Sequence, residues 1–128
     1  MKNKKITYAV YLDTDTNRLE TVLFEENNVK DLLHAQDIKV MRRSIGNQPY
    51  YILCRDTGMF HVTEPVSGVN ESGVPMLYGP LLILKDNGNE EPGFTYNEAQ
   101  AVRKNAACQV VSISHKKPHY VITNVAFA

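Results

Sequence analysis

Apolar residues recur at every second position along most of this chain, and this spacing predicts a protein built mainly from β-strands. The clearest case is residues 6–12, where Ile6, Tyr8, Val10 and Leu12 alternate with Thr, Ala and Tyr. Successive side chains of a strand point to opposite faces of the sheet. These four residues therefore predict a first strand with one inward face.

Further strand segments follow the first and are separated by turn-forming residues. One of them begins with residues 38–40, and the others comprise residues 19–24, 50–54, 59–62, 76–84, 109–114 and 119–127. Gly79-Pro80 interrupts one of them, and Pro80 lacks the amide donor of a ladder, so it belongs at a strand start, bulge or edge. Residues 64–75 contain two prolines, two glycines and two serines, and they are predicted to form the longest irregular loop.

Two short helices interrupt the strands. Asn27 or Asn28 can cap the first helix, which carries an apolar stripe and is expected to end near Gln36. The second helix begins at Thr95, because Thr95 and Glu98 have the spacing of a capping box. Its predicted inner face consists of Tyr96, Ala99, Val102 and Ala106.

The predicted order of elements is β-β-α-β-β-β-β-α-β-β. Strands in the majority with two short helices indicate the α+β class, with a mainly antiparallel sheet covered on one face. A chain of 128 residues has the usual length of one domain, and neither a linker nor a repeat divides it. We therefore expect a single α+β domain over residues 1–128.

Charge and hydropathy indicate which partners and which cellular compartment the protein can have. Fourteen basic residues balance fourteen acidic ones, so no field of the whole protein attracts nucleic acid or an acidic membrane. No apolar run approaches the roughly 18 residues needed to span a bilayer. Two cysteines do not form a disulfide framework. We expect a cytoplasmic protein with reduced thiols and no membrane contact.

Two matched segments carry a resemblance to a known family. The residues GPLLIL at 79–84 and FTYNEAQ at 94–100 resemble an uncharacterised small-protein family of bacteriophages and Gram-positive mobile elements. The resemblance covers about residues 5 to 105 and rests on structural motifs. This chain lacks the proline-proline-asparagine stretch of the family before Gly79 and adds a hairpin after Cys108. The resemblance implies a small accessory protein and no particular activity.

One group of carboxylates imitates a calcium site. Asp13, Asp15 and Asn17 have the spacing that opens a calcium-binding loop. Arg18 stands where the loop needs glycine, and Phe24 where it needs a bidentate glutamate. A hairpin turn with Asx hydrogen bonds is the better interpretation.

The histidines and cysteines do not have the spacing of a catalytic or metal site. His115 and His119 flank a Lys-Lys-Pro turn, whereas zinc needs three or four ligands and the lysines would repel a cation. Cys54 and Cys108 lie among apolar residues and are expected to pack as small hydrophobes. We therefore expect no catalytic residues, no cofactor and no metal. An enzyme whose thiol or histidine site assembles only in the folded chain is kept as an alternative.

A nucleic-acid-binding module is a second alternative. Arg42 and Arg43 lie close to tyrosines in the sequence, and Lys116 and Lys117 come late in the chain. Cations beside aromatic side chains on a sheet can neutralise phosphates and stack bases. Alternatively, these cations line a solvated sheet edge and prevent unwanted strand pairing.

Recognition of another protein, or self-association, is the main functional prediction. The terminal strand, residues 120–128, is apolar on both faces. Such a strand can lie at an edge and accept a partner strand, or lie centrally and be buried on both sides. The candidate interaction residues, from the 64–75 loop and this strand, are Val66, Val69, Tyr120 and Ile122.

Overall fold

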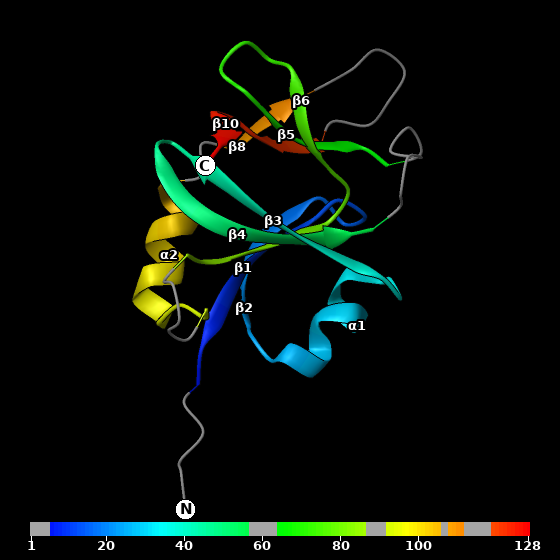
Figure 1. Cartoon of the computed structure of the whole chain (residues 1–128), viewed down its shortest axis with the longest axis vertical. Coiled ribbons are helices and arrows are strands. Elements are labelled where there is room, and N and C mark those ends of the chain that lie inside the picture. Colours follow the sequence, from blue (N-terminus) through cyan, green and yellow to red (C-terminus); the bar gives the residue numbers. More distant parts are fainter. Residues whose placement is uncertain (1–5, 57–63, 87–91, 106–107, 112–118) are drawn as a thin grey trace, which may run out of the picture.

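The chain forms an α+β fold, as its sequence predicts (Figure 1). The structure, a computed structural model, describes residues 6–56, 64–86, 92–105, 108–111 and 119–128, and only the backbone of residues 105, 108–111 and 119. The described elements are β1 (Tyr8–Asp13), β2 (Arg18–Leu23), the 3-10 turn η1 (Glu26–Asn28), α1 (Val29–Leu33), β3 (Ile38–Ile45), β4 (Gln48–Arg55), β5 (Val66–Val69), β6 (Pro75–Tyr78), β7 (Leu81–Lys85), α2 (Tyr96–Asn105), β8 (Cys108–Val111), β9 (His119–Ile122) and β10 (Val125–Phe127).

The strands form two sheets and not the single sheet that the sequence predicts. The larger sheet has six strands in the order β10-β3-β4-β7-β1-β2, and all its neighbours are antiparallel. The smaller has the order β6-β5-β9-β8, with one parallel pair between β5 and β9. Pro80 directly precedes β7, as expected for a residue without an amide donor. Mainly antiparallel pairing is thus confirmed.

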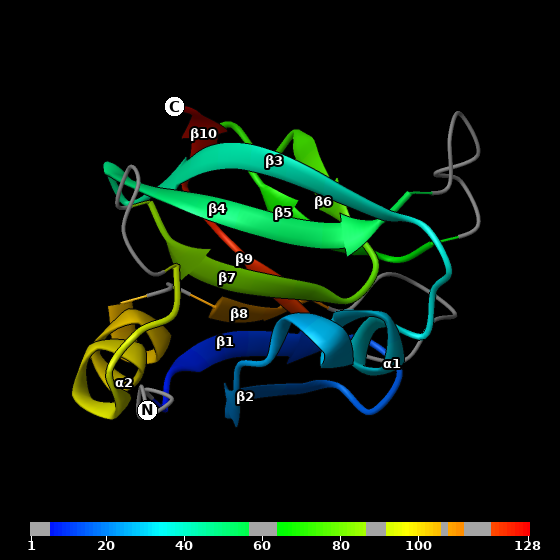
Figure 2. The ribbon, with the colours of Figure 1, turned by 60° about the horizontal axis from the view of Figure 1, so that its bottom comes forward.

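Other elements pack against both faces of the six-stranded sheet around β1 (Figure 2). Val10 and Leu12 of β1 pack toward the second sheet and α2, whereas Ala9 and Tyr11 pack toward α1. These four residues are 6% exposed or less. The prediction of one inward face for this strand, and of a sheet covered on one side, is therefore wrong. The reason is tertiary, because β1 lies between β7 and β2 with a packed layer on each face.

The first helix is shorter than its sequence predicts. α1 ends at Leu33, because His34 adopts a left-handed conformation with φ 51°, and such a residue terminates a helix. Asn28 occupies the N-cap position but makes no capping hydrogen bond. Its side chain instead donates to Glu25 Oε2 at 3.1 Å.

The start of the second helix is confirmed. Thr95 N–H donates to Glu98 Oε1 at 2.8 Å, and Glu98 N–H donates to Thr95 Oγ1 at 3.2 Å, which is the reciprocal pair of a capping box. Ala99 and Val102 are buried as predicted. Tyr96 is 51% exposed, so its predicted place on the inner face is wrong.

Two predictions about the second half of the chain are corrected. Residues 64–75 are not an irregular loop, since β5 lies within them and a turn, in which Asn70 Oδ1 accepts the Val74 N–H at 2.9 Å, leads to β6. The terminal strand is split near Asn124, which has φ 59°. β9 lies inside the smaller sheet and β10 at the edge of the larger one. The predicted strand 59–62, Ala106 and the turn at 115–118 lie outside the described residues.

Candidate functional site

The outer edge of the six-stranded sheet has a step at β3. β3 pairs with β4 over its whole length, residues 38–45, whereas β10 pairs with residues 43–45 alone. Figure 2 shows β10 beside one end of the longer β3. Among the described residues, positions 38–42 therefore have a strand on one side only. We call residues 38–42 the open edge of β3.

The hydrogen-bond register shows which backbone groups of the open edge point outward. Asp56 N–H donates to Asp37 O at 2.9 Å, and these residues are opposite each other in the β3–β4 register. In antiparallel pairs the backbone groups of successive residues alternate between the two sides. Odd-numbered residues of β3 thus face β4, and Val40 and Arg42 face outward. Within the described part of the chain, the N–H and C=O of Val40 have no hydrogen-bond partner.

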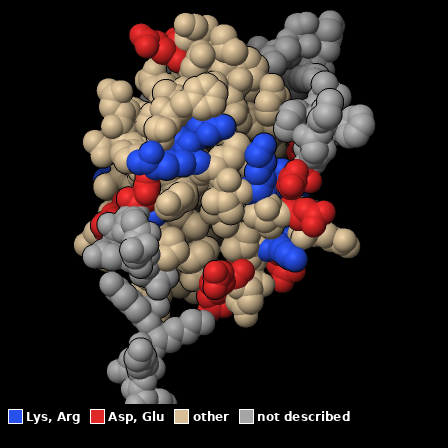
Figure 3. All heavy atoms as spheres, viewed as in Figure 1, with Lys and Arg blue, Asp and Glu red and all other residues tan. Residues whose placement is uncertain are grey.

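Three cations lie on the open edge or at its border with β10. Arg42 Nε forms an ion pair with Asp86, and the Arg42 side chain remains 51% exposed. The Arg43 guanidinium lies 4.8 Å from the centre of the Phe127 ring. Lys39 is exposed, and neither it nor Arg43 has an ion pair within the described residues. Figure 3 shows Lys and Arg side chains gathered in the middle of the face viewed, over the region of β3 and β4.

A cavity of about 190 Å³ opens beneath the open edge, between β3, β4 and β6. Met41, Met76 and Leu77 supply apolar walls, and Lys39 and Arg43 supply charge at the same cavity. Lys39, Met41 and Arg43 share one face of β3, because residues two apart on a strand point the same way. That face is turned toward the second sheet. Arg55, Asp56 and Glu64 also line the cavity. The open edge therefore adjoins a space with apolar walls and charges of both signs, with Lys39 and Arg43 on the β3 side.

Cys54 lines the same cavity but is not poised for nucleophilic chemistry. Its side chain is 5% exposed and its Sγ donates weakly to Lys39 O at 3.8 Å. Burial raises the pKa of the thiol above its ordinary value, and the nearby Lys39 charge opposes this only in part. The thiol therefore stays protonated near neutral pH, whereas the thiolate is the nucleophile. The prediction that Cys54 packs as a small hydrophobe is confirmed.

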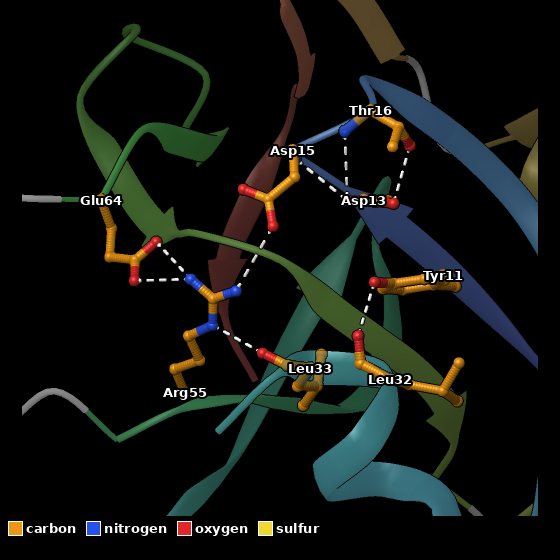
Figure 4. Close-up of polar contacts among 8 residues, drawn as sticks. All are labelled: Tyr11, Asp13, Asp15, Thr16, Leu32, Leu33, Arg55 and Glu64. Atoms are coloured by element: carbon orange, nitrogen blue, oxygen red, sulfur yellow. Dashed lines mark hydrogen bonds and ion pairs between the residues drawn. The ribbon is translucent and has the colours of Figure 1, made fainter. Parts of the chain in front are cut away.

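Arg55 joins four parts of the fold beside this cavity (Figure 4). Its Nε donates to Leu33 O at 2.6 Å, at the C-terminal end of α1. Its Nη1 donates to Glu64 Oε1 at 2.9 Å, and its Nη2 lies 3.6 Å from Asp15 Oδ2 in the β1–β2 turn. A cation at a helix C-terminus is favourable. Arg55 therefore fixes the ends of α1 and β4 relative to the residues that precede β5.

The calcium-like sequence forms the predicted hairpin turn. Asp13 Oδ1 accepts hydrogen bonds from Asp15 N–H at 2.9 Å and Thr16 N–H at 3.3 Å. Asp13 Oδ2 accepts one from Thr16 Oγ1 at 2.7 Å. Burial opposes ionisation of Asp13, but these hydrogen bonds outweigh it and hold the pKa of the carboxyl below its ordinary value. The carboxylate oxygens of Asp13 are thus used by the turn itself.

The predicted interaction residues lie apart from the open edge. Val66 and Val69 are half-buried in β5, and Tyr120 is half-buried in β9. Ile122 is fully buried in the core, so it cannot belong to an interaction surface and that prediction is wrong. β9 is a central strand between β5 and β8, and Ile122 packs in the core with Leu77 and Ile83.

The structure describes two of the four residues that were predicted to contact nucleic acid. Arg42 and Arg43 are neighbours at the open edge, whereas Lys116 and Lys117 lie outside the described residues. His115 also lies outside them, and of His119 and Cys108 the backbone alone is described. Whether these later residues approach the two arginines stays a prediction.

Four residues that matter at this site were not singled out from the sequence: Val40, Arg55, Glu64 and Phe127. The sequence signal for Val40 was an apolar residue between Lys39 and Arg42 on a predicted strand. Its side chain is 61% exposed, and its place on an open edge depends on where β10 ends along β3. Such an edge is defined by strand order, which alternation does not reveal.

No protein-family model, curated protein or solved structure matches this chain. The resemblance to small proteins of phages and mobile elements stays a prediction. Within the described residues, none of the helices has the length and apolar character needed to cross a bilayer. In the same part of the chain, His, Cys, Asp and Glu side chains form no group of three or more that could hold a metal ion.

Proposed function

We propose that this protein is a non-enzymatic module that binds another protein, by accepting an extended segment at the open edge of β3. The observation that carries this proposal is the outward-facing N–H and C=O of Val40, beside an exposed apolar side chain. Adding a strand to an exposed edge satisfies such groups and is a common mode of peptide recognition. The raised pKa of the buried Cys54 thiol supports a binding role over thiol catalysis.

Two other sheet edges, those of β2 and β6, are less suited to accept a strand. The β2 edge carries the exposed ion pair between Arg18 and Glu20, and Thr21 Oγ1 bonds to Gln100 of α2 at 2.7 Å. The β6 edge begins with Pro75. Charges, covering helices and proline are devices that protect sheet edges from pairing. The open edge also carries cations, which repel a second copy but not an acidic partner.

The contacts of the two arginines weigh against nucleic acid as the partner. Arg42 is paired with Asp86, and Arg43 packs on Phe127 and donates from Nη1 to Arg42 O at 2.8 Å. Phosphate contacts need cations free to replace counterions. The balanced net charge supplies no long-range attraction. Protein recognition therefore agrees better with this geometry.

The proposed setting is the cytoplasm, with the protein acting as a small accessory factor of a phage or mobile element. The resemblance of residues 79–84 and 94–100 to that family supports this setting. The balanced charge and ordinary globular composition are compatible with it.

Panning a random peptide library against the full chain tests the proposal. Selected peptides should lose binding to the Val40→Pro variant, because proline removes an outward donor while leaving β3–β4 pairing intact. Leu23→Pro is the matched control on the opposite edge. The Leu23 N–H also points outward, since its partner Tyr8 bonds to Phe94 on the other side.

Two outcomes of this experiment would overturn the proposal. One is that no peptide is enriched, and the other is that Val40→Pro and Leu23→Pro bind the selected peptides equally well. Sedimentation of the free protein tests the alternative occupant. We expect a monomer throughout the concentration range of the binding assay, and a dimer abolished by Val40→Pro would assign the open edge to self-association instead.

A further inference from the structure

We infer that the segment accepted at the open edge carries an acidic side chain opposite Lys39 and a large apolar side chain opposite Met41. This inference rests on the proposed function and names the chemistry of the partner. It follows from three features of the open edge: the direction of its side chains, the size of the cavity and the sign of its charge.

The register fixes which partner side chains enter the cavity. A strand added beside β3 places alternate side chains on opposite faces. The partner residues opposite Lys39 and Met41 therefore project toward the second sheet, where the cavity lies. The residue opposite Val40 projects toward the face that carries α1. Because Met41 turns its backbone groups to β4, its new partner would form a non-hydrogen-bonded pair, in which side chains approach most closely.

The volume of the cavity suits one side chain. It measures about 190 Å³, whereas pockets for drug-sized molecules are roughly 300–1,000 Å³. A cavity of roughly 150 Å³ can hold a benzene-sized ring, and Met41, Met76 and Leu77 form the apolar part of this one. Met41 and Met76 on its walls are adaptable side chains that can fit around an inserted group. An aromatic or leucine side chain is thus the expected anchor.

The charge at this edge selects an acidic neighbour and disfavours a second copy. Lys39, Arg42 and Arg43 lie within five consecutive positions of β3. Pairing two copies of this edge would bring these cations against one another, and like charges across strands destabilise pairing. A carboxylate opposite Lys39 would instead gain a cross-strand ion pair. An antiparallel partner would run in the same direction as β10. From its N-terminus it would have an apolar residue opposite Met41, a β-branched residue opposite Val40 and an acidic residue opposite Lys39.

A short blocked peptide with phenylalanine-valine-glutamate at its centre is the probe. Its binding to the full chain can be followed by amide chemical shifts, with the largest change expected at Val40. Replacing the glutamate by lysine should weaken binding roughly five-fold. Replacing the phenylalanine by alanine should weaken it on the order of tenfold or more.

A charge-reversal variant separates recognition from a general effect on the fold. Lys39→Glu alters an exposed side chain and should make the lysine peptide the tighter ligand of the two. Equal binding of all three peptides, or an unchanged preference in Lys39→Glu, would overturn the inference. If library peptides without this pattern bind and remain sensitive to Val40→Pro, the inference fails and the proposed function stands. If Val40→Pro affects no peptide, both fail.

Discussion

Arg55 donates from Nη1 to both carboxylate oxygens of Glu64, at 2.9 Å to Oε1 and 3.2 Å to Oε2. Arg55 ends β4 of the larger sheet, and Glu64 lies shortly before β5 of the smaller one. Their side chains are 18% and 14% exposed. Both hydrogen bonds come from one nitrogen, and charge-assisted, poorly solvated contacts of this kind are stronger than neutral hydrogen bonds. This pair therefore connects the two sheets beside the cavity.

Removing the Glu64 charge should destabilise the protein. Glu64→Gln keeps an acceptor oxygen but removes the negative charge closest to a poorly solvated guanidinium. We expect a loss of about 1–3 kcal/mol, between the values for exposed and buried pairs. Chemical denaturation measures this loss. Glu20→Gln, in the exposed pair with Arg18, is the control and should change stability by less than about 0.5 kcal/mol. Equal effects of the two substitutions would contradict a structural role for Glu64.

Gly79 should resist substitution because of the same carboxylate. Its φ is +71°, and a Cβ placed there would lie 2.7 Å from Glu64 Oε2. Gly79→Ala should therefore cost more than the roughly 1–2 kcal/mol of a left-handed alanine. Gly73→Ala isolates the backbone cost, since its φ is +82° and nothing lies within 4 Å of the added atom. The prediction fails if the two variants unfold at the same denaturant concentration.

Tyr11 should stabilise the fold through a single hydrogen bond. Its hydroxyl donates to Leu32 O at 2.6 Å, and Tyr11→Phe leaves that carbonyl without this donor. We expect a loss of about 1–2 kcal/mol near neutral pH. Tyr96→Phe, at an exposed ring, is the control and should be close to neutral.

The contribution of Tyr11 should also depend on pH in the alkaline range. Burial, with the nearby charges of Asp13 and Asp15, raises the pKa of Tyr11 from 10.0 to about 12. The unfolded chain thus releases this proton at lower pH than the folded one. The stabilisation is fully present below pH 10 and is lost as pH rises through about 12. The difference in unfolding free energy between wild type and Tyr11→Phe should shrink over that range, and a constant difference would contradict it.

The capping box should contribute measurably to α2. Thr95→Ala removes the Oγ1 acceptor of Glu98 N–H, and loss of an N-cap costs about 1 kcal/mol. Thr95→Ser keeps the oxygen and should retain most of the stability. Thermal denaturation of the three proteins checks this order. Similar melting temperatures for the alanine and serine variants would show that the hydroxyl contributes little.

Cys54 should be inert in the native protein. Its burial and raised pKa leave little accessible thiolate near neutral pH. In a Cys108→Ser background, alkylation at pH 7.5 should be much slower for the folded chain than for the chain in denaturant. Comparable alkylation rates in the two states would contradict this prediction and would show that the Cys54 thiol is reactive in the folded protein.

Two features that depend on residues near one another in sequence were predicted correctly, although the end of α1 was not. The capping box of Thr95 and Glu98 and the Asx turn at Asp13 form as expected. Each depends on hydrogen bonds between groups three residues apart or fewer. Strand alternation likewise predicts the α+β class, because side-chain direction repeats along any strand wherever it lies in a sheet.

Features that depend on distant residues were predicted poorly. Val66 and Val69 belong to β5, although the turn-rich sequence around them predicts a loop. Their strand exists because β6 and β9 pair with it, and β9 lies about fifty residues further along the chain. Tyr11 was placed on an outer face for the same reason, since α1 covers it only after folding.

The sequence by itself determined the α+β class, the capping box that starts α2 and the Asx turn at Asp13. Only the tertiary structure decided that the last residues divide between two sheets and that β10 covers just one end of β3. Strand order follows from which apolar faces can be buried together, and this depends on the whole chain at once. The open backbone of Val40 is a product of that order, so no local pattern could have predicted it.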